Sequence, residues 1–151
     1  MPNIFSVACA HCHVQNNNYV TPDALKLLCG SCERQVFTGR PVDVDGAGFA
    51  KHAVAGQIPV LAMFYINHSP GRGLDIRFPD YAFKYEPHVR CVEINLEHAQ
   101  DLAEALNVRH APVLMLFKNG QPVDRWSGKP HYDIVGEWLD NHGIVARPKR
   151  P

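Results

Sequence analysis

The sequence predicts an α/β protein with a central mixed β-sheet flanked by helices, preceded by a small cysteine-rich module. Four of the five cysteines fall within the first 40 residues. From residue 41 onwards, short apolar runs alternate with segments of helical periodicity, which is typical of a sheet covered by helices on both faces. A hairpin signal late in the chain predicts that the sheet is mixed rather than purely parallel.

The four N-terminal cysteines form two CxxC pairs with sixteen residues between them. Two thiolates three residues apart on a tight turn can reach one tetrahedral ion with bonds of about 2.3 Å, and this spacing is typical of zinc sites. Gly30, inside the second pair, suits the positive φ that such a turn often needs. We therefore predict one structural Zn²⁺ bound by Cys9, Cys12, Cys29 and Cys32. Disulfides or redox dithiols are the alternative, which we expect less because the first residues do not resemble a secretion signal.

The rest of the N-terminal segment is polar and without periodicity, which favours a short knuckle–strand–knuckle ribbon. We expect His11 and His13 to be solvent-exposed neighbours of the metal site rather than ligands. A ribbon over residues 1–40 is too small to bury a core, so metal binding is expected to supply much of its folding free energy. Residues 38–41 are interpreted as the linker to the next domain.

An α/β domain is expected over residues 41–143, followed by a flexible tail over 144–151. A continuous apolar run at 59–65, bounded by Pro59 and polar residues, predicts a fully buried central strand. Asn119-Gly120 is the strongest hairpin signal in the chain. The other strands are expected at 42–44, 89–95, 113–117 and 122–126, and the helices at 46–55, 75–85, 97–106 and 132–141.

This order of elements, with several short motifs, resembles the thioredoxin family. The most specific motifs are Val92-Glu93-Ile94-Asn95, Val108-Arg109-His110-Ala111-Pro112, Leu116-Phe117-Lys118-Asn119-Gly120 and Gly128. With four cysteines in front, the chain resembles the zinc-ribbon thioredoxins of bacteria, the thioredoxin 2 type. The resemblance implies a thioredoxin fold, a cis peptide bond at Pro112 and a substrate groove beside it.

The same resemblance indicates that the family's dithiol motif is replaced. Counted forward from the central strand, the two catalytic cysteine positions fall on Ser69 and Arg72; counted back from Pro79, they fall on Gly71 and Leu74. The family's buried acid falls on Met63. We therefore expect no catalytic dithiol and no dithiol–disulfide exchange at this site. Cys91, inside a predicted strand, is expected to pack as a small hydrophobic residue with an unreactive thiol.

The leading functional hypothesis is a redox-inactive, thioredoxin-like module that binds a protein or peptide, as a chaperone-like protein would. The loops around the former motif and around Pro112 are expected to form its groove. The expected groove residues are His68, Ser69, Pro70, Gly71, Arg72, His110, Ala111, Pro112 and Gly128.

Other functions remain open at the level of the sequence. Ser69 favours a helix cap but also suits a glutathione-binding or residual thiol-related enzyme, and Cys91 could react with a small oxidant. The N-terminal cysteines could act as a redox sensor. A zinc-ribbon nucleic-acid binder is disfavoured because Lys and Arg total 15 against 15 for Asp and Glu. No apolar run approaches the roughly 18 residues of a membrane span, so we expect a cytoplasmic protein.

Overall fold

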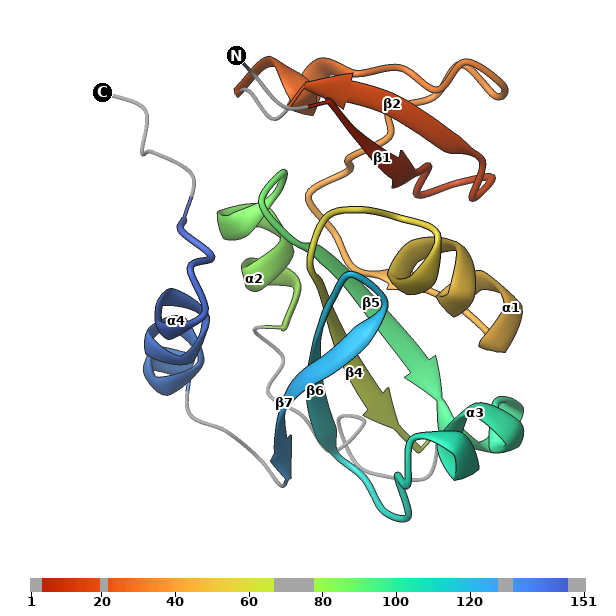
Figure 1. The fold of residues 1–151 in the computed structure, drawn as a ribbon, viewed down its shortest axis with the longest axis vertical. Helices are drawn as coiled ribbons and strands as arrows, with labels where there is room; N and C mark the ends of the chain where they lie inside the picture. The colour runs from red at the N-terminus through yellow and green to blue at the C-terminus, as the bar shows by residue number, and fades with distance from the viewer. Residues whose placement is uncertain (1–3, 20–21, 67–77, 128–131, 147–151) are drawn as a thin grey trace.

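The computed structural model of the 151-residue chain describes residues 4–19, 22–66, 78–127 and 132–146. It contains a two-stranded sheet near the N-terminus and a five-stranded sheet with helices beside it (Figure 1). The small sheet lies across one end of the large one, at the top of Figure 1. We call the part that carries the small sheet, residues 4–19 and 22–40, the N-terminal module.

The N-terminal module is built on an antiparallel pair, β1 (Ile4–Ala8) and β2 (Gln15–Tyr19). A 3₁₀ helix, Pro22–Lys26, and one isolated bridge between Leu28 and Gln35 follow. The sequence analysis expected a single strand between two knuckles and missed β1, which precedes the first cysteine pair.

A small core lies beneath β1, contrary to the expectation that the module buries none. Phe5 and Val7 of β1 are 5% and 2% exposed and pack with Val36 and Phe37. Ile58, which lies outside the module, completes this cluster. The module therefore buries apolar surface with the help of a residue from the rest of the chain.

The five-stranded sheet has the order β3-β5-β4-β6-β7. β3 (Val42–Asp43) and β4 (Val60–Tyr65) run parallel to β5 (Arg90–Asn95) on either side of it. β6 (Val113–Lys118) is antiparallel to β4, and β7 (Gln121–Ser127) is antiparallel to β6. The sheet is therefore mixed, as predicted, because β6 runs opposite to the other four strands. The turn at Asn119 and Gly120, both at positive φ, reverses the chain between β6 and β7.

Two apolar clusters cover the two faces of this sheet, and β4 contributes to both. Leu61, Met63 and Tyr65 face the cluster that contains α2 (Phe78–Tyr85) and α4 (Tyr132–Asn141). Val60, Ala62 and Phe64 face the opposite cluster, next to α1 (Gly46–Phe49) and α3 (Gln100–Ala105). Figure 1 shows α1 and α3 on one side of the strands and α2 and α4 on the other. Every residue of β4 is buried, as its continuous apolar run predicted.

Two of the predicted helices are divided in the structure. The helix expected at 46–55 continues from α1 as a π-helix, η2 (Ala50–Val54). The helix expected at 97–106 consists of a 3₁₀ turn, η4 (Leu96–His98), and α3. Asn95 caps η4, because its Oδ1 accepts a hydrogen bond from the N–H of Glu97 at 3.0 Å.

The described chain after α4 is packed rather than loose. Ile144 is 2% exposed, and Ala146 packs against the cluster of α2 and α4. His88 Nδ1 lies 2.9 Å from the carbonyl oxygen of Val145. The boundary expected at residue 143 is therefore too early by at least three residues. Residues 147–151 lie outside the described part of the chain.

Candidate functional site

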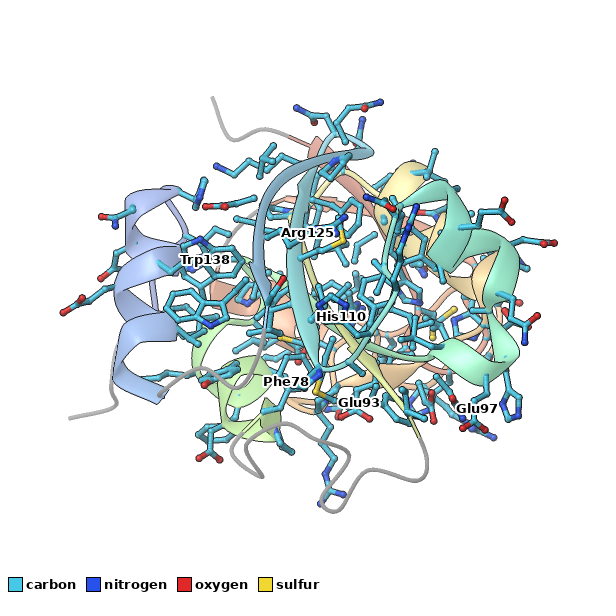
Figure 2. All side chains as sticks on the ribbon, turned by 90° about the horizontal axis from the view of Figure 1, so that it is seen from below. Phe78, Glu93, Glu97, His110, Arg125 and Trp138 are labelled. Carbon is cyan, nitrogen blue, oxygen red and sulfur yellow. The ribbon has the colours of Figure 1, made fainter. Side chains whose placement is uncertain are left out.

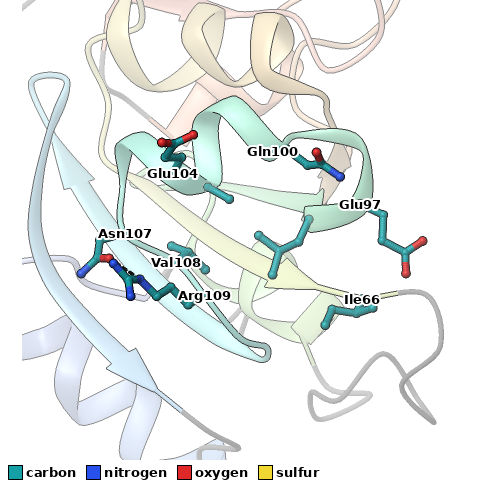
Figure 3. Close-up of a pocket in the computed structure, with 9 residues that line it drawn as sticks. Ile66, Glu97, Gln100, Glu104, Asn107, Val108 and Arg109 are labelled. Atoms are coloured by element: carbon teal, nitrogen blue, oxygen red, sulfur yellow. Dashed lines mark hydrogen bonds between the residues drawn. The ribbon is translucent and has the colours of Figure 1, made fainter.

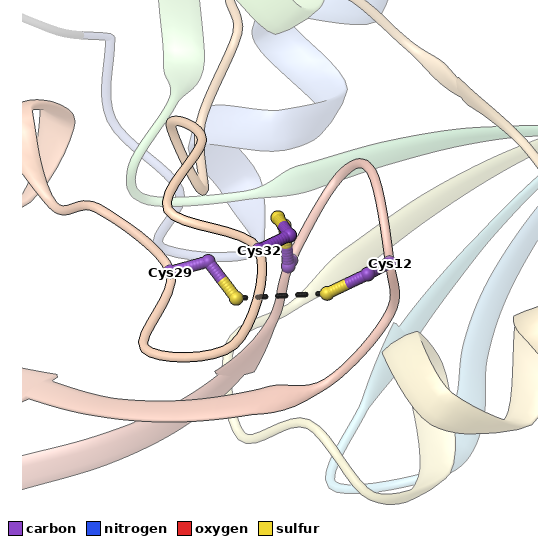
Figure 4. A group of neighbouring side chains, drawn as sticks. Cys12, Cys29 and Cys32 are labelled. Atoms are coloured by element: carbon purple, nitrogen blue, oxygen red, sulfur yellow. Dashed lines mark hydrogen bonds between the residues drawn. The ribbon is translucent and has the colours of Figure 1, made fainter.

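The four N-terminal cysteines converge on one point. All four Sγ atoms lie within 4.8 Å of one another, and the pairs Cys9–Cys32 and Cys12–Cys29 are each 3.6 Å apart. Figure 4 labels three of them and shows the side chains of Cys12 and Cys29 pointing toward each other from two turns. Bonds of about 2.3 Å to a tetrahedral ion place the sulfur atoms about 3.8 Å apart. The residues present therefore fit a metal ion.

The two cysteine turns repeat the same backbone geometry. The N–H of His11 donates to Cys9 Sγ and the N–H of Ser31 donates to Cys29 Sγ, each at 3.3 Å. His13 and Glu33, each four residues after the first cysteine of its pair, have φ of 65° and 64°. The positive φ therefore falls at these two positions and not at Gly30, where the sequence analysis expected it.

The pKa values of two of these thiols shift in opposite directions. The backbone N–H groups of Cys32 and Ser31 lower the pKa of Cys29 to about 6, because they stabilise the thiolate. The backbone N–H of Arg34 lowers the pKa of Cys32, but burial and the neighbouring thiols outweigh it and raise that pKa to about 11. A thiolate is the form that binds metals, so the turn geometry already favours a ligand at Cys29.

The two histidines nearest the cysteines differ in their surroundings. His11 is exposed, as expected. His13 is half-buried, and its Nδ1 lies 3.0 Å from Nε2 of His52, which is 2% exposed. The expectation of a solvent-exposed His13 is therefore wrong, because His52 of η2 packs against the metal-site turn.

Cys91 is separate from the cysteine cluster. It is 1% exposed in β5, within the apolar cluster that also contains Met63. Burial raises the pKa of the Cys91 thiol well above its ordinary value. Neither its exposure nor its acidity suits a nucleophile.

Part of the predicted groove is described. The Ala111–Pro112 peptide bond is cis and leads directly into β6. His110 is exposed beside it (Figure 2). Ala111 and Pro112 are half-buried. The other predicted groove residues, His68, Ser69, Pro70, Gly71, Arg72 and Gly128, lie outside the described residues.

A hollow of about 410 Å³ lies near the described part of the groove (Figure 3). Its apolar lining comes from the end of β4, from η4 and α3, and from the segment that follows α3. Carboxylate and guanidinium groups lie at its rim. The lining residues are Ile66, Leu96, Glu97, Gln100, Ala103, Glu104, Asn107, Val108 and Arg109. The sequence analysis did not single out this hollow, because its walls come from segments that are separate in the sequence.

The thioredoxin family model matches residues 41–141. The chain belongs to the thioredoxin family. Thioredoxin C-3 of Corynebacterium nephridii is 27% identical over 135 residues, which is 89% of this chain and 92% of the relative. Thioredoxin 1 of Synechococcus elongatus is 30% identical over 100 residues, or 66% of this chain and 94% of the relative.

A solved structure supports the same fold. A mutant thioredoxin from Halobacterium salinarum NRC-1 superposes with a TM-score of 0.61, covers 72% of this chain and 96% of its own, and is 22% identical. The thioredoxin fold predicted from the sequence is therefore confirmed. Among the described residues of this thioredoxin-family chain, no helix is long and apolar enough to cross a membrane.

The sequence analysis missed a group of buried polar residues where the thioredoxin-like sheet meets the N-terminal module. Glu86, Arg90 and His52 are each at most 2% exposed. One signal for Arg90 was available, because it is a charged residue between apolar Val89 and Cys91 in a predicted strand. Two of its hydrogen-bond acceptors, the carbonyl oxygens of Ala8 and Val36, lie more than 50 residues away in the sequence.

Proposed function

We propose that this thioredoxin-family protein holds one structural zinc ion at Cys9, Cys12, Cys29 and Cys32 and binds polypeptides without dithiol–disulfide exchange. One observation carries the proposal. The five cysteines of the chain divide into four whose sulfur atoms converge and one that is buried in β5. None of them is therefore placed as the exposed dithiol that thioredoxin chemistry needs.

The donor set favours zinc in a structural role. Four thiolates in tetrahedral arrangement suit zinc, with iron as the other common metal for such a set. A site with four protein ligands leaves no open position for a substrate or water. Two of the sulfur atoms accept backbone N–H bonds from their own turns, which orients them before the metal arrives.

The residues that replace the family motif support the loss of redox chemistry. Ser69 offers an alcohol in place of a thiolate, and Arg72 cannot form a disulfide. Met63, 3% exposed, occupies the position of the family's buried acid. Cys91 does not substitute for the missing pair, because its buried thiol resists ionisation.

The groove beside Pro112 is the proposed polypeptide site. Members of the thioredoxin family act on protein substrates. Exposed His110, the cis peptide bond at Pro112 and the nearby hollow of about 410 Å³ offer an accessible, partly apolar surface. Such a surface suits an extended segment of an unfolded or partly folded protein.

Metal analysis and thiol counting on the native protein test the first part. We expect one zinc per chain and no rapidly reacting thiol. Iron in place of zinc would correct the identity of the metal, and two or more fast thiols would overturn the cysteine assignment.

An insulin-reduction assay tests the loss of redox activity. We expect no turnover above background for the wild type. The double variant S69C/R72C should gain turnover, whereas the single variant S69C is the matched control and should not. Robust wild-type turnover would overturn the proposal.

Suppression of aggregation of a chemically denatured client tests polypeptide binding. We expect the wild type to suppress aggregation, and His110→Asp to weaken this effect by placing a charge in the groove. His98→Asp, which changes another exposed histidine, in η4, is the control. Equal suppression by both variants would remove the groove from the proposal.

A further inference from the structure

Arg90 is a fully buried cation between the metal-site module and the thioredoxin-like sheet. It begins β5, and its side chain is 1% exposed. Figure 1 shows that β5 begins at the end of the sheet nearest the N-terminal module. Removing a guanidinium from water costs several kcal/mol unless hydrogen bonds and charge replace the lost hydration.

The N-terminal module supplies most of that replacement. Arg90 Nη2 donates to the carbonyl oxygens of Ala8 and Val36, each at 2.8 Å. The guanidinium carbon lies 4.8 Å from the centre of the Phe37 ring. Within the sheet domain, Arg90 Nη1 donates to Glu86 Oε2 at 3.1 Å.

The same ion pair is hydrogen-bonded to the linker. Glu86 Oε1 accepts the N–H of Gly39 at 2.7 Å. Glu86 and Arg90 therefore contact the chain just before the first cysteine turn and at three residues after the second. Arg90 Nε has no partner within the described residues. Loss of any of the other hydrogen bonds would therefore leave a further N–H of the buried guanidinium unsatisfied.

The carbonyl groups that Arg90 binds are positioned by the cysteine turns. Ala8 immediately precedes Cys9, and Val36 follows Cys32 by four residues. The N–H of Ala10 also donates to the Val36 carbonyl, at 3.3 Å. Any rearrangement of the two turns therefore moves the two acceptors of a buried charge.

We propose that Arg90 is a positioning residue for the metal centre, and that through it metal occupancy stabilises the thioredoxin-like sheet. This inference rests on the proposed metal site. The bound metal holds the two turns, the turns hold the carbonyl oxygens of Ala8 and Val36, and these satisfy Arg90 at the start of β5. Without the metal, Glu86 is left as the main partner of a buried guanidinium in a strand that pairs with both β3 and β4.

Metal release and thermal unfolding of the full-length chain test this coupling. Arg90→Met keeps the length of the side chain but removes its charge and donors. We expect a chelator with a chromogenic readout to extract the metal about 10- to 100-fold faster from R90M than from the wild type. Arg125→Met is the matched control, because Arg125 also donates to two backbone carbonyls, those of Leu106 and Asn107, away from the metal site.

Tryptophan fluorescence reports the sheet domain separately. Both tryptophans, Trp126 and Trp138, lie in the thioredoxin-like domain. We expect metal removal to lower the wild-type Tm by about 10 °C. It should lower the Tm of R90M by less than half as much, because that variant has no buried guanidinium to lose the carbonyl oxygens of Ala8 and Val36. Equal Tm shifts with unchanged metal release would overturn the inference.

Hydrogen exchange in the wild type keeps the test decisive if R90M fails to fold. Metal removal should speed exchange of β5 amides while β7 amides are little affected; unchanged β5 exchange would overturn the inference. If the wild type has normal metal content but metal removal changes neither its Tm nor its β5 exchange, this inference alone is refuted and the metal site stands. A chain that takes up neither zinc nor iron would refute the proposed metal site and the inference with it.

Discussion

The N-terminal module and the five-stranded sheet are stabilised in different ways. The buried cluster of the module includes two candidate metal ligands, Cys9 and Cys29, and one residue from outside it, Ile58. The sheet has a large apolar cluster on each face, with β4 buried between them. A short segment cannot bury enough apolar surface to balance its conformational entropy, so the module depends on its thiols and on the neighbouring domain.

Loss of a cysteine ligand is expected to have the largest effect. Cys12→Ser should abolish stable metal binding and disrupt the β1–β2 pair, because structural zinc sites of this kind contribute about 10 kcal/mol or more. Metal content and hydrogen exchange of β1 provide the measurements. Ser31→Ala, which keeps the backbone N–H to Cys29, is the control and should retain the metal. A C12S protein with full metal content would contradict the four-ligand site.

The sheet should instead respond most to loss of apolar volume. Leu61→Ala removes a side chain that is 0% exposed in the central strand, and we expect it to cost about 3 kcal/mol of unfolding free energy. Leu28→Ala in the module changes a side chain that is 58% exposed and should cost less than about 0.5 kcal/mol. Chemical denaturation measures both. A smaller cost for L61A than for L28A would contradict the contrast between the two regions.

Folding stability should depend on pH through His52, which lies where the two regions meet. Burial, followed by Arg90 and His13, lowers the pKa of His52 to about 3, so the folded protein keeps His52 neutral. The unfolded chain protonates it below about pH 6.5. Folding stability should therefore fall as the pH drops below 6.5, by about 1.4 kcal/mol per pH unit from this group alone, or about 2 kcal/mol at pH 5.

His52→Gln removes this contribution. The difference between wild-type and variant unfolding free energies should change between pH 6.5 and pH 5, and the change isolates His52 from acid-induced loss of metal. Exposed His11→Gln serves as the control and should keep the wild-type slope. An identical slope for H52Q and the wild type would show that His52 titrates normally in the folded protein.

The turn at Gly56, between η2 and β4, should give the smallest effect. A Cβ at Gly56 would lie 2.4 Å from the carbonyl oxygen of His52, so Gly56→Ala forces a backbone shift that costs about 1 to 2 kcal/mol. Gly46→Ala meets no atom within 4 Å and is expected to be neutral or to stabilise by up to about 1 kcal/mol. Thermal unfolding compares the two, and equal Tm values would contradict the close approach at Gly56.

Much of the fold was predictable because its signals are local. The apolar run at 59–65 is sufficient to indicate β4, and the Asn119-Gly120 turn predicts the hairpin that joins β6 to β7. β1 was missed because its five residues become a strand by packing Phe5 and Val7 against distant side chains. The divided helices at 46–55 and 97–106 were missed because periodicity does not distinguish α-, π- and 3₁₀-helical turns.

In the candidate site, too, the parts with a local sequence signal were predicted and the others were not. The spacing of the two CxxC pairs predicted four sulfur atoms that could hold one metal ion, and their convergence within 4.8 Å agrees with it. The groove prediction is only partly described, with His110 to Pro112 placed and residues 68–72 outside the described chain. The hollow beside α3 carried no sequence signal, because its walls come from segments that are separate in the sequence.

The sequence by itself indicated the family through short motifs. Short-range spacing and periodicity determined the order of strands and helices in the thioredoxin-like domain and the two CxxC pairs. The tertiary structure alone decided which polar groups are buried. Arg90, Glu86 and His52 look like ordinary polar residues until Ala8, Val36, Gly39 and His13 pack against them from the N-terminal module. Burial is a property of distant neighbours, and the cost of burying a charge makes those neighbours part of the protein's stability.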